Sequence, residues 1–299
     1  MKKILILTLF ITFSIELFSF EIKDNRIYDS RGNSIEIKEY KRIAIIAPAA
    51  IETIFLLNGG DSIVGIGKNV RSPIWPQEET DKLPSIGNTN NPSFEQVLSM
   101  ETDLMILNNA ALRTTELLNK IDIPYIIHDT PNDIDSILES IKIYGKLLNR
   151  EKEAEILYED SLAILEKIKT KTAENPLNLN GLILFSSSPL VSFSGDYIPG
   201  KILTALGVDN ISGDVTGNMP VLSQEHLLES DVDVIIVSQN MGTIQEILRS
   251  NPILAETRAG REQNIMTFNT IDFLRGSPRV FSAMEILYEE LEKISKTKQ

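Results

Sequence analysis

The stretch NDIDSILESIKIYGKLLNREKEAEILYEDSLAILEKIKTK, residues 132–171, lies in the middle of the chain and sets the arrangement of the rest. Its first part places apolar residues at steps of three and four, which predicts one apolar helix face, at Ile134, Ile137, Leu138, Ile141 and Tyr144. After a short break at residues 147–150, a second helix carries apolar residues on more than one side. A helix of roughly 23 residues is about 35 Å long, more than one small α/β lobe needs. We therefore predict a rigid helix that joins two lobes.

The segments on either side of this helical stretch resemble each other. EQVLSMETDLMIL (residues 95–107) aligns without a gap with EHLLESDVDVIIV (residues 225–237), so that Glu95 matches Glu225 and Asp103 matches Asp233. A second, shorter repeat pairs LNGGD (57–61) with LGVD (206–209). Because the period is well over a hundred residues, the repeat indicates a duplicated lobe and not a solenoid.

The N-terminal residues have the order of a secretory signal peptide. Lys2 and Lys3 precede an apolar run, and the small residue Ser19 follows it. An uncleaved membrane anchor is the alternative, but the apolar run is short for a membrane span. We predict a signal peptide over residues 1–20 that is removed on secretion.

Composition and charge exclude several classes of protein. The 299 residues allow two domains, and 42% of them are hydrophobic, as in ordinary globular proteins. The formal net charge of −13 excludes nucleic acid and direct lipid binding as functions. The chain has no cysteine, which excludes disulfides, thiolate metal sites and a lipid-modified anchor. A secreted protein without that anchor would be lost from the cell unless an outer membrane retained it, so we expect a Gram-negative periplasm.

Strand-like and helix-like segments alternate through the chain, which predicts an α/β fold. We expect two Rossmann-like lobes with mainly parallel sheets, joined by one long α-helix, with a ligand cleft between the lobes at the carboxyl ends of the strands. The expected boundaries are residues 1–20 for the signal peptide, 21–149 for the N-terminal lobe, 150–173 for the linking helix and 174–299 for the C-terminal lobe. Ser93 and Ser223 are expected to cap corresponding helices of the two lobes.

Five groups of motifs, spread in order over residues 28–290, point to one family. They are YDSRG (28–32) followed by RIAII (42–46), ETIFLLNGGDSIVG (52–65), SFE (93–95) with DLMI (103–106), YGKLLNREKEA (144–154) and LGVDN (206–210). Together they resemble the periplasmic substrate-binding proteins of ABC importers for iron siderophores, haem and cobalamin, the class built around a helical backbone. The resemblance implies a ligand held between two lobes with little hinge motion, and delivery to an ABC permease in the inner membrane.

The resemblance also assigns a docking role to Glu95 and Glu225, one in each lobe, which match the glutamates that pair with permease arginines. The alternative is a local one, because a carboxylate in the first turn of a helix is stabilised by the helix dipole. Their recurrence at matching positions favours docking.

The ligand is expected to be an iron chelate, either a ferric siderophore or haem, and no resident cofactor is expected. Arginine and aromatic residues of the cleft loops suit a bulky or flat anion. The expected ligand-binding residues are Arg71, Trp75, Arg113, Phe193, Tyr197, Met219, Phe273 and Arg275. Arg275 is the first choice, because its loop resembles the basic cleft segment of the family. Tyr197 and Met219 are also conceivable axial haem ligands, although packing roles are favoured.

Three alternatives stay open. A corrinoid carrier belongs to the same family. A bare metal ion would require several converging ligands, but His128 and His226 are the only histidines and lie in different lobes. A two-lobed periplasmic enzyme is disfavoured, because the chain has no Gly-x-Ser-x-Gly elbow, no His-Glu pair at metal spacing and no phosphate-binding loop. The protein is therefore predicted to be a binding protein and not an enzyme.

Overall fold

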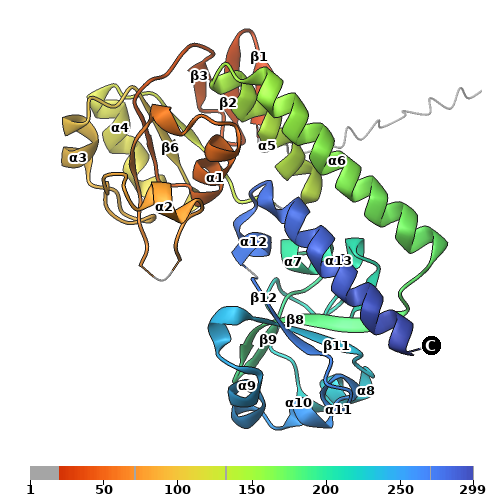
Figure 1. Cartoon of the computed structure of the whole chain (residues 1–299). Coiled ribbons are helices and arrows are strands. Elements are labelled where there is room, and N and C mark those ends of the chain that lie inside the picture. The colour runs from red at the N-terminus through yellow and green to blue at the C-terminus, as the bar shows by residue number, and fades with distance from the viewer. Residues whose placement is uncertain (1–19, 71, 132, 270, 299) are drawn as a thin grey trace, which may run out of the picture.

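The computed structural model describes residues 20–298, except 71, 132 and 270. The predicted signal peptide thus lies outside the described residues, apart from its last residue, Phe20. Figure 1 shows two lobes connected along one side by a long helix, α6 (Glu151–Glu174). In the described part of the chain, no helix is both long and apolar enough to cross a membrane.

A small antiparallel sheet begins the described chain. It consists of β1 (Phe20–Lys23), β2 (Arg26–Asp29) and β3 (Ser34–Glu36). The buried carboxylate of Asp29 stabilises the turn that follows β2, because it accepts hydrogen bonds from the backbone N–H groups of Arg31 and Asn33. It also accepts a hydrogen bond from the backbone N–H of Ile127. The last of these bonds joins the small sheet to the main sheet of the N-terminal lobe.

The N-terminal lobe is built on a four-stranded parallel sheet in the order β5-β4-β6-β7. Its strands are β4 (Ile43–Ile45), β5 (Ile63–Ile66), β6 (Leu104–Leu107) and β7 (Tyr125–Ile127). Its helices are α1 (Pro48–Leu56), α2 (Gln77–Thr80), α3 (Phe94–Ser99) and α4 (Thr115–Ile121), with 3₁₀ turns η1 (Gly60–Ser62) and η2 (Asn109–Thr114). Each strand is largely apolar, as expected for a parallel sheet that is buried on both faces.

The C-terminal lobe repeats this architecture. Parallel strands lie in the order β10-β8-β11-β12, and β9 pairs antiparallel with β8. The strands are β8 (Leu179–Ser187), β9 (Leu190–Ser192), β10 (Val208–Asn210), β11 (Val234–Ser238) and β12 (Ile265–Phe268). The helices are α7 (Ile198–Ala205), α8 (Gln224–Glu229), α9 (Ile244–Ser250), α10 (Ile253–Glu256), α11 (Arg258–Arg261) and α12 (Ile271–Arg275), with the 3₁₀ turn η3 (Gln239–Met241). Mainly parallel sheets in two lobes confirm the predicted fold class.

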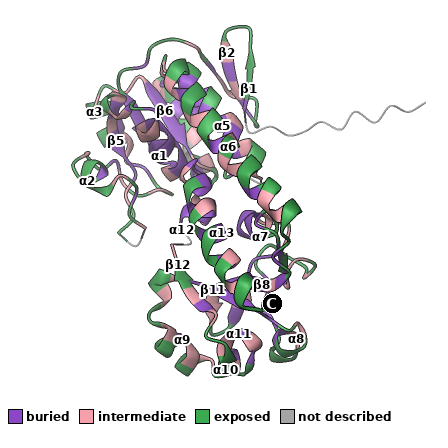
Figure 2. Ribbon diagram, turned by 45° about the vertical axis from the view of Figure 1, so that its right-hand side comes forward, coloured by how far each residue is buried: buried purple, intermediate pink, exposed green. Residues whose placement is uncertain are grey.

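Three long helices form the connection between the lobes. The central sequence stretch folds as α5 (Ile134–Leu147) and α6, which pack against each other, and α13 (Arg279–Lys298) packs along α6. Figure 2 shows exposed residues along the outer side of α6, while the strands of both sheets are largely buried. Helix α6 is therefore a surface strut, held along one side only.

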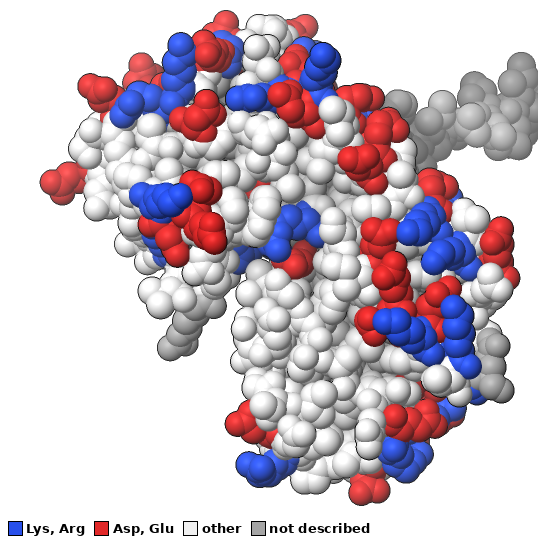
Figure 3. Space-filling view, viewed as in Figure 1, with Lys and Arg blue, Asp and Glu red and all other residues white. Residues whose placement is uncertain are grey.

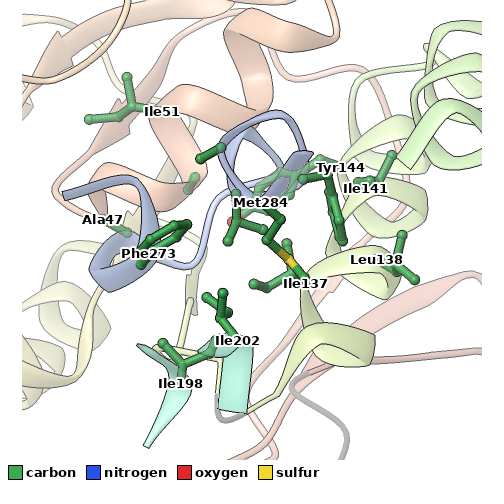
Figure 4. Close-up of a cluster of buried hydrophobic side chains, with 14 of the residues drawn as sticks. Ala47, Ile51, Ile137, Leu138, Ile141, Tyr144, Ile198, Ile202, Phe273 and Met284 are labelled. Carbon is green, nitrogen blue, oxygen red and sulfur yellow. The ribbon is translucent and has the colours of Figure 1, made fainter. Parts of the chain in front are cut away.

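One hydrophobic core runs through the junction of the two lobes. Its buried members include residues of α5, α7, α12 and α13 and of α1 with its N-cap, and Figure 4 labels ten of them: Ala47, Ile51, Ile137, Leu138, Ile141, Tyr144, Ile198, Ile202, Phe273 and Met284. Moving one lobe against the other would open this core to water, because close-packed interiors do not deform smoothly. The lobes are thus packed together and not merely tethered.

The duplication seen in the sequence is matched by equivalent hydrogen bonds in the two lobes. Ser93 caps α3 by accepting from Gln96 N at 3.5 Å, and Ser223 caps α8 by accepting from His226 N at 3.0 Å. In the N-terminal lobe, Asp103 N donates to Arg42 O, and the Asp103 carboxylate accepts from Arg42 N.

In the C-terminal lobe the same two bonds join Asp233 to Asn180. The residues that precede these aspartates in the helix-to-strand turns also match, because Glu101 and Asp231 both have a φ of 49°. Each lobe thus carries the same helix, turn and strand unit.

Candidate functional site

A pocket lies between the lobes at the carboxyl ends of their strands. Its volume is about 410 Å³, and its lining residues follow β4, β5, β6 and β7 of one lobe and β12 of the other: Pro48, Ser72, Asn108, Asn109, Ala110, Thr130, Ile271, Leu274 and Arg275. We call this the interlobe pocket. The carboxyl ends of parallel strands are where α/β sheets bind ligands. Figure 3 shows a notch between the two lobes, with mostly uncharged walls and Lys or Arg side chains at its inner end.

A buried ionic network forms the base of this pocket and joins the lobes. Glu52, fully buried in α1, accepts from Arg275 Nη1 at 2.9 Å and from Ser277 Oγ at 2.6 Å. Arg275 Nη2 also donates to Ser72 Oγ at 2.7 Å and to the Pro73 carbonyl at 3.1 Å. The Arg275 side chain is only 5% exposed. Its charge is therefore compensated by a carboxylate, and most of its donors are already used.

A second cation, Arg279 at the start of α13, reaches the same carboxylate from the other side. Its Nη1 lies 3.6 Å from Glu52 Oε2 and 2.8 Å from Asp272 Oδ1. Burial raises the pKa of Asp272 above its usual value, although Arg279 pulls in the opposite direction. The guanidinium of Arg279 also lies over the ring of Trp75, 5.2 Å from its centre. Four charged side chains thus hold α1, α12 and α13 together.

The neighbourhood of Trp75 is a second hollow, on the side of the long helix. This helix-side groove has a volume of about 530 Å³ and is lined by Trp75, Phe268, Asp272 and Arg279 together with residues of α6 and α13. Trp75 was expected to face the ligand cleft. It instead lines this groove, where the Arg279 guanidinium lies over its ring, and it is not among the residues that line the interlobe pocket.

The remaining predicted ligand residues are dispersed. Phe193 and Phe273 are fully buried core residues, not cleft residues as expected: Phe273 stacks on Phe268 at 5.0 Å, and Phe193 on Tyr197 at 5.8 Å. The apolar surfaces of both rings are covered by neighbouring side chains of the core. Met219 is 38% exposed, Arg113 is exposed in η2, and neither is among the residues that line the two hollows. Arg71 lies outside the described residues. Of the predicted residues that the structure describes, only Arg275 lines the interlobe pocket.

The amide and hydroxyl groups of the pocket, and the carboxylate under it, were not predicted from the sequence. Asn108 holds the pocket loops, because its Nδ2 donates to the Ile46 and Thr89 carbonyls. Asn109 and Thr130 are exposed. The sequence did contain a signal for Asn109 and Thr130, since they lie in the loops that follow the strands at residues 104–107 and 125–127. Glu52 had no such signal, because its partners are more than two hundred residues away in the chain.

Both histidines have structural surroundings. His128 is buried, its Nδ1 lies 2.8 Å from the Tyr144 hydroxyl, and it packs against Phe20. Burial lowers the pKa of His128 to about 4, and a weaker attraction from Asp129 opposes this shift. His226 Nε2 lies 2.8 Å from the Ile211 carbonyl. No group of three or more His, Cys, Asp or Glu among the described residues converges as a metal site would.

The two glutamates expected to dock a permease occupy equivalent places. Glu95 lies in the first turn of α3 and Glu225 in the first turn of α8, and both are exposed. The two helices belong to different lobes and lie far apart in Figures 1 and 2.

The chain belongs to the periplasmic binding protein family, whose sequence profile matches residues 43–270. Among curated relatives, the petrobactin-binding protein YclQ of Bacillus subtilis is 25% identical over 219 residues, which is 70% of this chain and 66% of that protein. A vitamin B12-binding protein of Yersinia pestis is 21% identical over 256 residues, covering 85% of this chain and 87% of the relative.

Solved structures share the fold over almost their whole length. The periplasmic haem-binding protein HutB of Vibrio cholerae gives a TM-score of 0.74 at 21% identity, covering 85% of this chain and 99% of that one. The periplasmic haem-binding protein RhuT of Roseiflexus gives a TM-score of 0.73 at 24% identity, with the same coverage. These likenesses confirm a two-lobed binding protein fold.

Proposed function

We propose that this protein is the periplasmic substrate-binding component of an ABC importer, which captures an iron chelate and delivers it to the permease of the inner membrane. The observation that carries the proposal is the interlobe pocket, built from the carboxyl ends of strands of both lobes in a member of the periplasmic binding protein family. Relatives named for petrobactin, and structural neighbours named for haem, support an iron-containing ligand.

The pocket has low net charge. Arg275 is the one ionisable side chain among its described lining residues, and Glu52 compensates that charge. Amide, hydroxyl and aliphatic groups make up the rest of the lining. This chemistry favours the corrinoid as a second candidate, because a large, weakly charged ligand with many amides can exchange hydrogen bonds with such walls. A relative named for vitamin B12 supports the same candidate.

A titration distinguishes these ligands. The protein without residues 1–20 would be titrated with haemin, a ferric catecholate, a ferric hydroxamate and cyanocobalamin, following tryptophan emission and the visible spectrum of the ligand. Trp75 is the only tryptophan, so its emission reports on a single place in the molecule. We expect saturable binding of one ligand below about micromolar, recovery of that ligand unchanged, and no saturation by the others.

Three variants locate the site, two in the interlobe pocket and one control in the helix-side groove. Asn109→Trp and Thr130→Trp would fill the interlobe pocket and are expected to abolish binding. Ile286→Trp, in the helix-side groove, is expected to leave binding intact. Binding that is lost only in the groove variant would move the ligand site to the groove. Chemical change of the recovered ligand would replace the binding function with an enzymatic one.

A further inference from the structure

Two leucines are exposed at matching positions of the two lobes. Leu98 in α3 is 50% exposed, and Leu228 in α8 is 46% exposed. Each follows an exposed glutamate by three positions, Glu95 or Glu225, which places carboxylate and leucine on the same side of a helix. The same pair of side chains is therefore presented twice, once on each lobe.

The exposure of these leucines does not come from poor packing of the helices. In each helix the preceding residue, Val97 or Leu227, is fully buried and fixes the helix to its lobe. The serine caps and the matching helix-to-strand turns fix the same orientation in both lobes. Leu98 and Leu228 consequently point away from the core in both lobes, because each helix is held in the same orientation.

A single exposed leucine on a protein surface needs no explanation. Here two of the exposed large apolar residues of the described chain occupy equivalent places in a duplicated unit, each beside an exposed carboxylate. Two other exposed apolar side chains, Ile156 on α6 and Ile286 on α13, lie on helices that connect the lobes. The repeated pair fits a partner with two similar sites.

We propose that Glu95 with Leu98, and Glu225 with Leu228, form two like docking patches for the permease, in which the leucines contribute apolar contact beside the ionic one. This inference rests on the proposed function. Each permease site would then present a basic side chain next to an apolar recess, complementary to one patch. Because exposed ion pairs contribute little affinity and are screened by salt, the leucines would supply the part of the affinity that salt does not weaken.

The test compares matched variants in binding to the permease and ATPase complex, purified in nanodiscs. Leu98→Ser/Leu228→Ser removes the apolar half of both patches, and Glu95→Gln/Glu225→Gln removes the charged half. Ile156→Ser/Ile286→Ser is the control, because it makes the same kind of change at exposed positions outside the patches. Ligand titration of each variant checks that the interlobe pocket is intact.

We expect the leucine variant to bind the complex at least about tenfold more weakly than the wild type, since each half-exposed leucine loses part of its burial energy. The difference in affinity between the leucine variant and the wild type should persist in 0.5 M NaCl. The difference between the glutamate variant and the wild type should shrink, because salt also weakens the binding of the wild type. The isoleucine control should bind as the wild type does.

Other outcomes separate the two proposals. Wild-type affinity of the leucine variant, together with weak binding of the glutamate variant, would overturn the inference and leave the proposed function standing. Absence of binding by the wild type, with or without ligand, would count against both. Sedimentation that shows a wild-type dimer dissociated by the leucine substitutions would assign the patches to self-association instead.

Discussion

Glu52 illustrates how much of the lobe junction depends on a single side chain. Its carboxylate is fully buried, bonds Arg275 and Ser277, and lies near Arg279, so the N-terminal lobe holds the segment that precedes α13. Removing one partner of a buried ionic network leaves the other charges without compensation, which costs more than the network itself contributes to stability.

We expect Glu52→Ala to lower the free energy of unfolding by about 4 kcal/mol, because Arg275 would remain buried without a counter-charge. Urea unfolding followed by circular dichroism measures the change. Glu155→Ala, at an exposed position of α6, is the control and should stay within about 0.5 kcal/mol of the wild type. Equal unfolding midpoints for Glu52→Ala and the control would contradict the structural role of the network.

His128 makes stability depend on pH. Its pKa is about 4 in the folded protein and about 6.5 in an unfolded chain, because burial disfavours the charged ring. The unfolded state therefore binds more protons between these values. The stabilisation from the neutral ring is complete above pH 6.5 and is lost as the pH falls towards 4.

We expect this one residue to account for a loss of about 3 kcal/mol between pH 7 and pH 4. The measurement is the difference between the unfolding free energies of wild type and His128→Gln across that range, which removes the contribution of the many carboxylates. A difference that does not vary with pH would show that the pKa of His128 is the same in the folded and unfolded states.

At the scale of elements, the contact between α5 and α6 explains how the sequence break at residues 147–150 becomes a tight helical hairpin. A Cβ atom built on Gly145 would lie 2.3 Å from the Cβ of Ala154. Glycine in α5 thus lets the two backbones approach closely, at the cost of a less favourable helix propensity. The direction of the strut α6 is determined at this contact.

We expect Gly145→Ala to lower the free energy of unfolding by about 2 kcal/mol, because overpacking outweighs the gain of about 1 kcal/mol in helix propensity. Exchanging the two residues, as Gly145→Ala/Ala154→Gly, should restore most of the loss. A double-mutant cycle in urea measures the coupling. Additive effects of the two substitutions would mean that the helices do not meet at these residues.

At the scale of the whole molecule, the shared core and the Glu52 network join the lobes into one body. Core residues of α1, α5, α7, α12 and α13 pack together, so a wide hinge motion would expose buried apolar surface. We therefore expect the interlobe pocket to be largely preformed, so that ligand binding would need only side-chain and loop adjustment.

We expect the distance between the outer parts of the lobes to change by less than about 2 Å when ligand saturates the pocket. Spin labels on Glu116→Cys in α4 and Arg249→Cys in α9 report this distance, and labelling is specific because the chain has no cysteine of its own. A shift of several ångströms on ligand addition would show a hinged protein. The same pair in Glu52→Ala should give a broader distance distribution.

The sequence by itself determined the elements and their repetition. Apolar periodicity predicted the helices α5 and α6, and the capping pattern predicted both serine caps, because these depend on local backbone preferences and on burial of one face. The alignment of residues 95–107 with residues 225–237 likewise predicted a duplicated unit, since the same residues fold in the same way.

Which side chains line the two hollows, in contrast, depends on the tertiary structure. Phe193 and Phe273 are chemically suited to a cleft, but their rings complete the core. Trp75 lies on the helix side of the ionic network, and Arg275 is bound to a carboxylate from the other lobe. These differences have one physical cause: the partner of each side chain is far away in the sequence, and which partner it meets is determined by how the two lobes pack.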